Sequence, residues 1–148
     1  MSNKILWIDD DIHRSFLRPY VDELIENQYS IIKVNNVDDI DDTINKEEGS
    51  ISLIIVDIAM PPGKKIDLRL AGGGLRTGKM ILEQLEKDNI VKNVPKVVFT
   101  NVDDDIVKNY CKNKNIPYLK KEDFFADELV KILSQIISSK FLKSNPYA

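Results

Sequence analysis

Acidic residues follow two short apolar runs of the chain. Asp9 and Asp10 come directly after the run at 4–8, and Asp57 ends the run at 52–57. Three carboxylates that meet in one place repel one another unless a cation joins them, and a hard divalent ion such as Mg²⁺ (or Mn²⁺) binds carboxylate and carbonyl oxygens. These acids therefore predict a divalent metal site, provided that the fold brings them together.

A hydroxyl and two ammonium groups end two further apolar runs. Thr100 closes the run at 95–100, and Lys120 and Lys121 follow the run at 116–119. Phosphoryl transfer depends mostly on positioning and on neutralising charge, so a metal site beside an ammonium and a hydroxyl is equipped for it. A carboxylate can itself be the covalent acceptor. The lysine would then hold the phosphoryl oxygens, and the threonine hydroxyl would donate a hydrogen bond to one of them.

The elements that must position these residues alternate along the chain. Strand-like apolar runs are followed by segments with apolar residues at helical spacing, and Pro19 should kink or restart the first helix. The expected strands are 4–8, 30–34, 52–57, 95–100 and 116–119, and the expected helices are 12–27, 38–46, 75–88, 103–113 and 123–142.

This alternation predicts an α/β fold with helices on both faces of a five-stranded parallel sheet. A doubly wound, flavodoxin-like sheet has the strand order 2-1-3-4-5, which makes strands 1 and 3 neighbours. Ligands of such sheets bind at the carboxyl ends of the strands. We therefore expect Asp9, Asp10 and Asp57 to converge, with Thr100 and a lysine beside them.

With 148 residues, the chain is expected to form one domain over 1–148, with a core at about 3–142 and a polar tail at 143–148. The segment 58–74 holds two prolines and four glycines and is predicted to be a long loop. From Met60 to Arg76 this region carries a net charge of +3, from Lys64, Lys65, Asp67, Arg69 and Arg76. We expect it to lie over or beside the acidic pocket and to influence access or partner choice.

Composition excludes several classes of protein. The formal net charge of −3, with no basic stripe, argues against direct DNA binding. No apolar run reaches the roughly 18 residues of a membrane span, and no secretory signal opens the chain. The single cysteine, Cys111, points to a reducing, cytoplasmic compartment. Because the sequence also has only one histidine, a Cys/His zinc site is excluded.

Four segments together resemble the receiver domain of two-component response regulators. They are Ile-Leu-Trp-Ile-Asp-Asp-Asp at 5–11, Val-Asp-Ile-Ala-Met-Pro at 56–61, Val-Val-Phe-Thr at 97–100 and Tyr-Leu-Lys-Lys at 118–121. The resemblance covers about 3–142. It implies a stand-alone signalling switch, not an enzyme, in which Asp57 accepts a phosphoryl group from a histidine kinase or phosphotransfer protein. Output would pass to a downstream protein partner, because the chain ends soon after the fifth helix.

The resemblance also implies a role for each site residue. Asp9 and Asp10 would bind Mg²⁺ together with Asp57 and the backbone carbonyl of Ala59. Thr100 would be the switch hydroxyl and Tyr118 the switch aromatic residue. The family's Tyr-Leu-x-Lys pattern places its lysine at Lys121 rather than at Lys120.

The chain departs from the family pattern at three places. Glu122 stands where the family usually has a proline after a cis peptide bond, so the bond here could be trans, given that a cis bond before a non-proline residue costs about 2.5–4 kcal/mol. Asn101 replaces a small residue after the switch threonine. The loop after Pro61 is longer than usual by roughly ten residues.

Other functions are also open to the sequence. The departures favour a receiver-like interaction module that is never phosphorylated. The residues Gly-Gly-Leu-Arg-Thr-Gly-Lys at 73–79 contain the G-x-x-x-x-G-K pattern of a P-loop, but they do not directly follow a strand, and Met80 replaces the metal-binding Ser/Thr. Phosphatases with an acceptor aspartate need a second aspartate two residues later, where this chain has Ala59.

Overall fold

A five-stranded parallel sheet forms the centre of the protein, in a computed structural model that describes residues 3–138. The strand order is β2-β1-β3-β4-β5, as expected from the sequence, and each neighbouring pair runs parallel. The strands are β1 (Lys4–Ile8), β2 (Ser30–Val34), β3 (Ile51–Val56), β4 (Lys96–Thr100) and β5 (Tyr118–Lys120).

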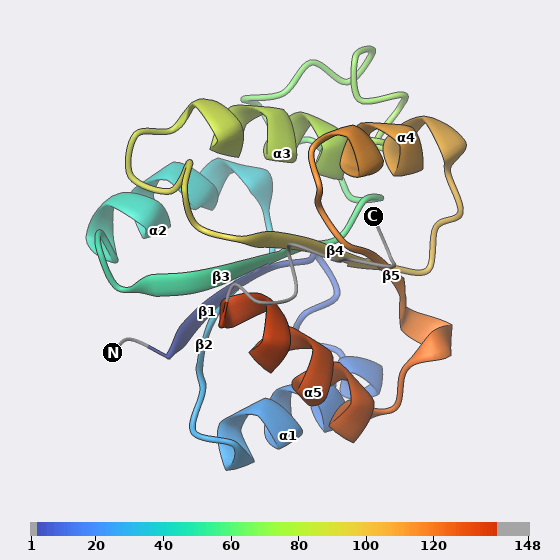
Figure 1. Cartoon of the computed structure of the whole chain (residues 1–148). Helices are drawn as coiled ribbons and strands as arrows, with labels where there is room; N and C mark the ends of the chain where they lie inside the picture. The colour runs from blue at the N-terminus through green and yellow to red at the C-terminus, as the bar shows by residue number, and fades with distance from the viewer. Residues whose placement is uncertain (1–2, 139–148) are drawn as a thin grey trace.

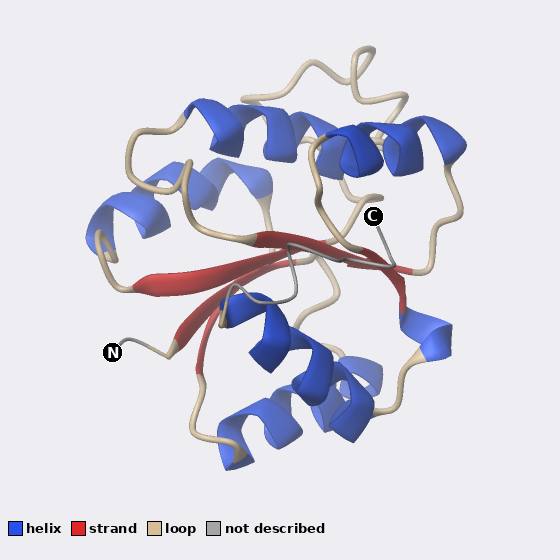
Figure 2. Cartoon of the chain, viewed as in Figure 1, coloured by secondary structure: helices blue, strands red, loops and turns tan. Residues whose placement is uncertain are grey.

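Helices cover both faces of this sheet (Figure 1). One face carries α1 (Arg18–Glu26) and α5 (Ala126–Ile137), and the other carries α2 (Ile40–Lys46), α3 (Thr77–Lys87) and α4 (Asp105–Asn113). Figure 2 shows the strands as one layer between these two layers of helices. Short 3-10 turns precede α1, α2 and α5: η1 (Ser15–Leu17), η2 (Val37–Asp39) and η3 (Lys121–Asp123).

The strands are apolar without alternation because both of their faces are buried. In β1, Leu6 and Ile8 pack toward α2, α3 and α4, whereas Ile5 and Trp7 pack toward α1 and α5. All four of these side chains are fully buried. The sheet is therefore a rigid platform whose carboxyl ends hold the acidic residues.

The first helical region begins later than its apolar spacing indicates. Residues 15–17 form η1, and α1 starts at Arg18 with Pro19 in its first turn. Proline is tolerated there because the first backbone N–H groups of a helix have no intrahelical acceptor. Pro19 thus restarts the helix, one of the two outcomes predicted. The last helix is described to Ile137, and the predicted extension to 142 and the tail at 143–148 lie outside the described residues.

Residues 58–76, between Asp57 and α3, form the long loop, which we call the insertion. The backbone N–H groups of Lys64 and Lys65 donate to the carboxylate of Asp38, at 3.0 and 3.3 Å. Ile66 and Ala71 are buried and join the core on the α2–α3–α4 side. The insertion is therefore an ordered segment with its own apolar anchors. It rises above α3 in Figure 1.

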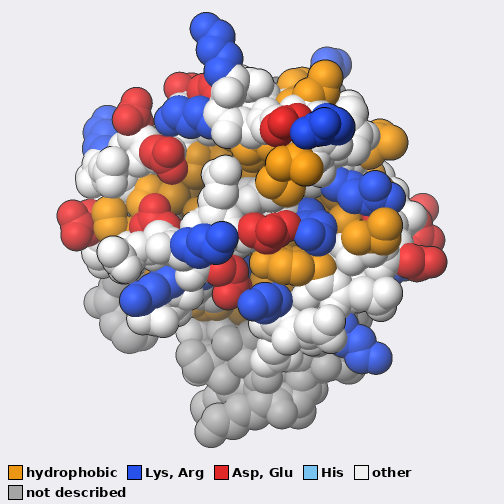
Figure 3. Space-filling model, turned by 90° about the horizontal axis from the view of Figure 1, so that it is seen from above, with side chains coloured by type: hydrophobic (Ala, Val, Ile, Leu, Met, Phe, Trp, Pro, Cys, Tyr) orange, Lys and Arg blue, Asp and Glu red, His pale blue; other side chains and the backbone are white. Residues whose placement is uncertain are grey.

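The insertion also presents apolar side chains at the surface. Leu68, Leu70 and Leu75 are each more than half exposed, as is Ile106 in α4. Figure 3 looks onto this side of the molecule, where apolar, basic and acidic side chains lie interspersed.

Of residues 3–138, no helix has both the length and the apolar character needed to cross a membrane.

Candidate functional site

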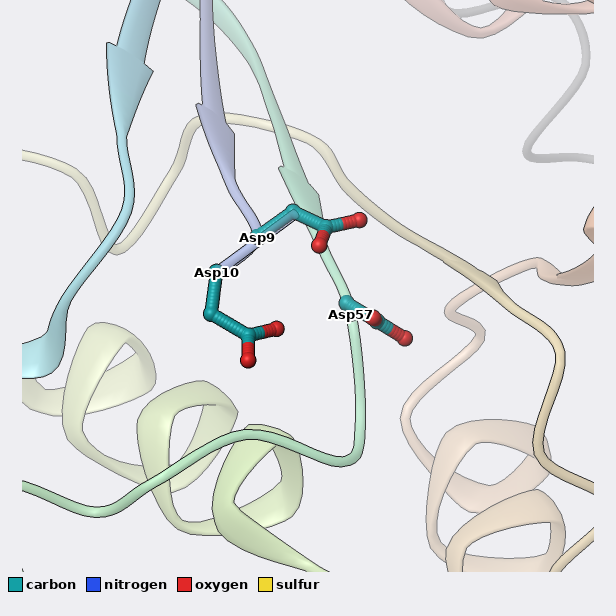
Figure 4. A group of neighbouring side chains, drawn as sticks. All are labelled: Asp9, Asp10 and Asp57. Atoms are coloured by element: carbon teal, nitrogen blue, oxygen red, sulfur yellow. The ribbon is translucent and has the colours of Figure 1, made fainter. Parts of the chain in front are cut away.

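Three carboxylates meet at the carboxyl ends of β1 and β3. Ile8 and Val56 are paired in the sheet, so the residues that follow them, Asp9 and Asp57, leave the two strands side by side. One carboxylate oxygen each from Asp9, Asp10 and Asp57 lies within 4.8 Å of the others. Figure 4 shows the three side chains at these strand ends. The convergence predicted from the strand order is therefore present.

The three acids differ in their surroundings. Asp9 is fully buried, Asp57 is 6% exposed, and Asp10 is exposed. The Oδ1 atom of Asp9 accepts a hydrogen bond from the backbone N–H of Asp11 at 2.8 Å, and Oδ1 of Asp57 accepts one from Ile58 at 2.8 Å. Each buried carboxylate thus has one oxygen fixed by the backbone and a second oxygen facing the site.

The second oxygen of each buried acid faces Lys121. Its Nζ lies 2.8 Å from Oδ2 of Asp9 and 3.4 Å from Oδ2 of Asp57. Lys120 points elsewhere, toward Asp103 and Glu122. Of the two lysines, Lys121 is the one that reaches the acidic cluster.

Lys121 reaches the acids without a cis peptide bond. Every peptide bond within 3–138 is trans, including the one between Lys121 and Glu122. Lys121 is instead the first residue of η3, directly after β5. Its side chain is only 7% exposed. The chain therefore places a buried ammonium at the site with Glu122 in the position after it.

The cluster carries unrelieved negative charge. Burial, and after it the charge of Asp57, raises the pKa of Asp9 to about 6, although Lys121 acts in the opposite direction. Burial and the neighbouring Asp11 also raise the pKa of Asp10. Burial lowers the pKa of Lys121, but the charges of Asp57 and Asp9 outweigh it, and the net shift is upward. One ammonium does not balance three carboxylates.

The donor set fits a hard divalent cation. Three carboxylate oxygens lie within 4.8 Å of one another, and the charge of Asp57 adds to burial in raising the pKa of Asp9. Mg²⁺ uses one or two carboxylates, with carbonyl oxygens and water completing its shell. Ala59, whose carbonyl the family resemblance implies as a further ligand, follows Asp57 by two residues in the insertion.

Thr100 and Tyr118 converge on one residue of the β4–α4 loop. The fully buried Thr100, which ends β4, accepts a hydrogen bond at Oγ1 from the backbone N–H of Val102 at 3.1 Å. The hydroxyl of Tyr118, whose side chain is nearly buried, donates to the carbonyl of Val102. The two residues that the resemblance names as switch groups are thus linked through the backbone of Val102.

Two cations of the insertion, Lys65 and Arg76, have partners away from the three acids. Lys65 pairs with Asp41 of α2 at 3.4 Å, and Arg76 pairs at 2.9 Å with Asp104, the residue that caps α4. The insertion thus bridges the starts of α2 and α4. Its influence on access or partner choice stays a prediction.

Sequence reasoning missed two contacts that hold the loop beside Asp57. The Thr77 hydroxyl donates to the carbonyl of Met60 at 2.5 Å, and the N–H of Gly78 donates to the carbonyl of Ile58 at 2.8 Å. A Cβ atom at Gly78 would lie only 2.2 Å from the Asp57 carbonyl oxygen. The one signal in the sequence was the Thr-Gly pair at the start of a predicted helix.

A third missed residue, Tyr20, bonds to the segment that follows Lys121. Its hydroxyl lies 2.9 Å from the carbonyl oxygen of Phe124 and 3.2 Å from that of Lys121. In the sequence Tyr20 appears only as part of the apolar stripe of the first helix, and nothing there indicates a partner more than a hundred residues away.

The P-loop alternative gains no support from the geometry. The Nζ of Lys79 pairs with Glu83 on the next turn of α3 at 2.6 Å, and it lies 4.9 Å from the centre of the Tyr110 ring. Its charge is therefore already engaged on the surface of α3.

Comparisons with known proteins give structural neighbours only. No protein-family model matches the chain, and no curated protein matches it in sequence. Among solved structures, a response regulator from Desulfuromonas acetoxidans is similar with a TM-score of 0.69 at 15% identity, over 92% of this chain and 97% of that one. The signal receiver domain of a putative Luxo repressor protein from Vibrio parahaemolyticus has a TM-score of 0.70 at 17% identity, over 97% and 95%.

A third neighbour is the BeF3-activated N-terminal receiver domain of RstA from Klebsiella pneumoniae, with a TM-score of 0.68 at 20% identity, over 91% of this chain and 98% of that one. All three are receiver domains or response regulators, and each is covered almost from end to end. The sheet order and the extent of these matches agree with the resemblance read from the four sequence segments. The chain therefore has the receiver-domain fold of response regulators.

Proposed function

We propose that this protein is a phosphorylation-dependent switch of a two-component phosphorelay, in which Asp57 accepts the phosphoryl group. The observation that carries the proposal is the position of the Asp57 carboxylate, at the end of β3 between two further acids and the Lys121 ammonium. A fold alone does not set a function, because one fold hosts many activities. The arrangement of three carboxylates and an ammonium suits phosphoryl acceptance and supports the proposal.

The chemistry follows from the two oxygens of Asp57. Oδ1 is occupied by the N–H of Ile58, so Oδ2, which faces Lys121, is the oxygen that would attack phosphorus. The new O–P bond forms as the bond between phosphorus and the donor breaks, and an ionised Asp57 has no proton to lose. Lys121 would hold a phosphoryl oxygen. A divalent cation bound by Asp9, Asp10, Asp57 and the carbonyl of Ala59 would supply charge neutralisation.

The switch would be read out through Val102. The Thr100 hydroxyl accepts from the N–H of Val102 and still has its own hydrogen to donate to the phosphoryl group. Movement of this hydroxyl toward the phosphoryl group would break the bond to Val102 and free the loop whose carbonyl holds Tyr118. A local change in hydrogen bonding then biases a two-state surface formed by α4, β5 and α5. The proposed partners are a histidine kinase or phosphotransfer protein upstream and a protein downstream. The buried free thiol of Cys111 fits a reducing compartment such as the cytoplasm.

Phosphorylation by a small donor tests the proposal. The protein is incubated with Mg²⁺ and acetyl phosphate, and intact mass is measured. We expect one added phosphate, absent without Mg²⁺ and absent in Asp57→Asn. Asp11→Asn is the matched control, because Asp11 belongs to the same acidic run but lies outside the cluster. An unchanged mass of the wild type, or label retained by Asp57→Asn, would contradict the proposal.

The second candidate is a receiver-like interaction module that is never phosphorylated. The replacement of proline by Glu122 and the ordered insertion favour it. Beryllofluoride separates the two candidates, since the similar RstA receiver domain is a BeF3-activated form. A phosphoryl acceptor should bind beryllofluoride with Mg²⁺ and change the amide spectrum around Thr100, whereas an inert module should not respond.

A further inference from the structure

The turn that carries Lys121 is short, and one of its backbone hydrogen bonds is long. η3 spans Lys121–Asp123, and the hydrogen bond from the N–H of Phe124 to the carbonyl of Lys121 is long, at 3.5 Å. The position after Lys121 is Glu122, so no proline ring restricts the chain there. Yet the Lys121 side chain is buried and its Nζ lies 2.8 Å from Asp9. A contact from outside the turn can therefore add to the ion pairs that hold Lys121 in place.

The hydroxyl of Tyr20 is placed to do so. It lies 2.9 Å from the carbonyl oxygen of Phe124 and 3.2 Å from that of Lys121, the two carbonyls that border η3. A phenol has one hydrogen, so it donates to one of these oxygens or is shared between them in a three-centre bond. In either case a single group from α1 closes the turn between β5 and α5.

The Tyr20 ring is itself fixed by packing. It meets the ring of Phe99 edge to face, with centroids 5.2 Å apart and an interplanar angle of 78°. Phe99 is fully buried in β4 and contacts Trp7 of β1 in the same manner, at 6.0 Å. These ring contacts therefore fix the position of the Tyr20 hydroxyl relative to β1 and β4, the strands that lead to Asp9 and Thr100.

We propose that Tyr20 is a positioning residue for Lys121: its hydroxyl holds η3 so that the Lys121 ammonium stays against the carboxylates of Asp9 and Asp57. This inference rests on the proposed function, because Lys121 is the group that would hold the incoming phosphoryl oxygen. It adds a residue from α1 that touches neither metal nor phosphoryl group and acts only through the backbone of η3.

Tyr20→Phe tests the inference, because it removes the hydroxyl and keeps the ring on Phe99. With Mg²⁺ and acetyl phosphate, we expect the rate of phosphate incorporation at Asp57 to fall by up to about tenfold, the equivalent of one hydrogen bond. The Mg²⁺ dissociation constant should not rise, since the three acids do not lie on η3 and a displaced Lys121 competes less for Asp9 and Asp57. A wild-type rate would overturn the inference.

Tyr29→Phe is the matched control. The Tyr29 hydroxyl also bonds across to the α5 side, to Ser134 at 2.8 Å, but near the opposite end of α1 and α5 from the site. Removing it should leave the rate unchanged. An equal fall in both variants would mean that Tyr20 acts only through general stability, and the inference would fail.

A double variant separates positioning from packing. In the Lys121→Ala background, Tyr20→Phe should cause no further loss, because the group that it positions is gone. Two losses that multiply would overturn the inference.

Hydrogen exchange keeps the inference distinct from the proposed function. If the wild type accepts no phosphate, the proposed function fails, but the anchoring is still measurable. The amides of Glu122, Asp123 and Phe124 should exchange faster in Tyr20→Phe than in the wild type and in Tyr29→Phe. Unchanged exchange would show that the hydroxyl does not hold η3.

Discussion

Asp57 and Lys121 face each other across the site, but the chain that leaves each of them is held in a different way. After Asp57 the chain runs through the insertion of residues 58–76 before α3 begins. The N–H of Gly78 and the hydroxyl of Thr77 return to the carbonyls of Ile58 and Met60. The insertion is thereby closed within a few residues of Asp57, mainly by backbone contact.

After Lys121 the chain makes only the short turn η3 before α5. Its position depends on side chains, namely the hydroxyl of Tyr20 and the attraction between Lys121 and the two buried acids. The two sides therefore differ in the kind of contact that follows the site residue. Backbone contacts return to the segment just after Asp57, whereas a side-chain hydroxyl and charge attraction act on Lys121.

Lys121→Met should have the largest effect on stability, because it removes the positive charge that pairs with the two buried acids. Asp9 and Asp57 would remain buried without a cation. We expect the free energy of unfolding of the metal-free protein to fall by about 3 kcal/mol at pH 8. The loss should be smaller at pH 5, where Asp9, with a pKa of about 6, is mostly protonated. Urea unfolding at both pH values measures this.

Lys120→Met is the control for that experiment. Lys120 is adjacent in sequence, but its partners Asp103 and Glu122 are well exposed. Exposed pairs contribute at most about 1 kcal/mol, so its loss should be small and nearly independent of pH. Similar losses from both variants would show that Lys121 does not neutralise the acids.

Gly78→Ala disturbs the segment that follows Asp57, because the added methyl group crowds the backbone there. The added Cβ would lie 2.2 Å from the Asp57 carbonyl oxygen and 2.7 Å from the Cα atom of Ile58. Because these are backbone atoms, α3 or the end of β3 must move. We expect a loss of about 2–3 kcal/mol in the free energy of unfolding, typical of overpacking, together with slower phosphate incorporation. Thermal unfolding and the acetyl phosphate assay measure the two effects.

Gly73→Ala separates crowding from backbone strain. Gly73 has φ +70°, but a Cβ there would meet nothing within 4 Å. The variant should lose only about 1 kcal/mol and keep the wild-type rate of phosphate incorporation. If Gly73→Ala slows phosphorylation as much as Gly78→Ala does, backbone closure next to Asp57 is not what positions that residue.

The sheet and its acids could be predicted from the sequence for one physical reason. Unbroken apolar runs such as 53–56 are typical of strands buried on both faces, and parallel strands bring their carboxyl ends to one edge. Once the strand order is assumed, the acids that end strands 1 and 3 must meet, and they do. Such an argument needs only local patterns and one topological rule.

The contacts that fix the site could not be predicted, because they depend on how helices cross the sheet. The Tyr20 hydroxyl reaches Phe124, 104 residues later in the chain. The approach of Gly78 to Asp57 depends on how closely α3 begins against β3. Neither contact leaves a spacing or a composition that sequence reasoning can detect. Pro19 shows the same limit, since the sequence could not decide between a kink and a restart.

The pH dependence of the free energy of unfolding tests whether the charge of the buried Asp9 affects stability. The pKa of Asp9 is raised from 3.8 to about 6 in the folded protein. Between these pH values the folded protein binds more protons than the unfolded chain, so the free energy of unfolding falls as pH rises from about 4 to 6. For the metal-free protein we expect a loss of the order of 1–2 kcal/mol over this range.

Mg²⁺ should reverse that trend, because it binds the ionised carboxylates. Its stabilising effect should be full at pH 7.5 and absent near pH 5, as measured by thermal unfolding with and without the ion. Asp9→Asn should flatten the pH dependence of the metal-free protein. An unchanged slope in that variant would mean that other groups cause it.

Asp38→Ala should have the smallest effect on stability. It tests whether the part of the insertion around Lys64 and Lys65 influences phosphate incorporation at Asp57. The Asp38 carboxylate accepts the backbone N–H groups of Lys64 and Lys65, so its loss frees two donors at the surface of the insertion. We expect about 1 kcal/mol less stability, since exposed N–H groups can turn to water. The rate of phosphate incorporation should stay within about twofold of the wild type, because Gly78 and Ile58 close the loop nearer to Asp57 than Asp38 does. A large fall in rate would show that the whole insertion, and not its closure, positions the acceptor.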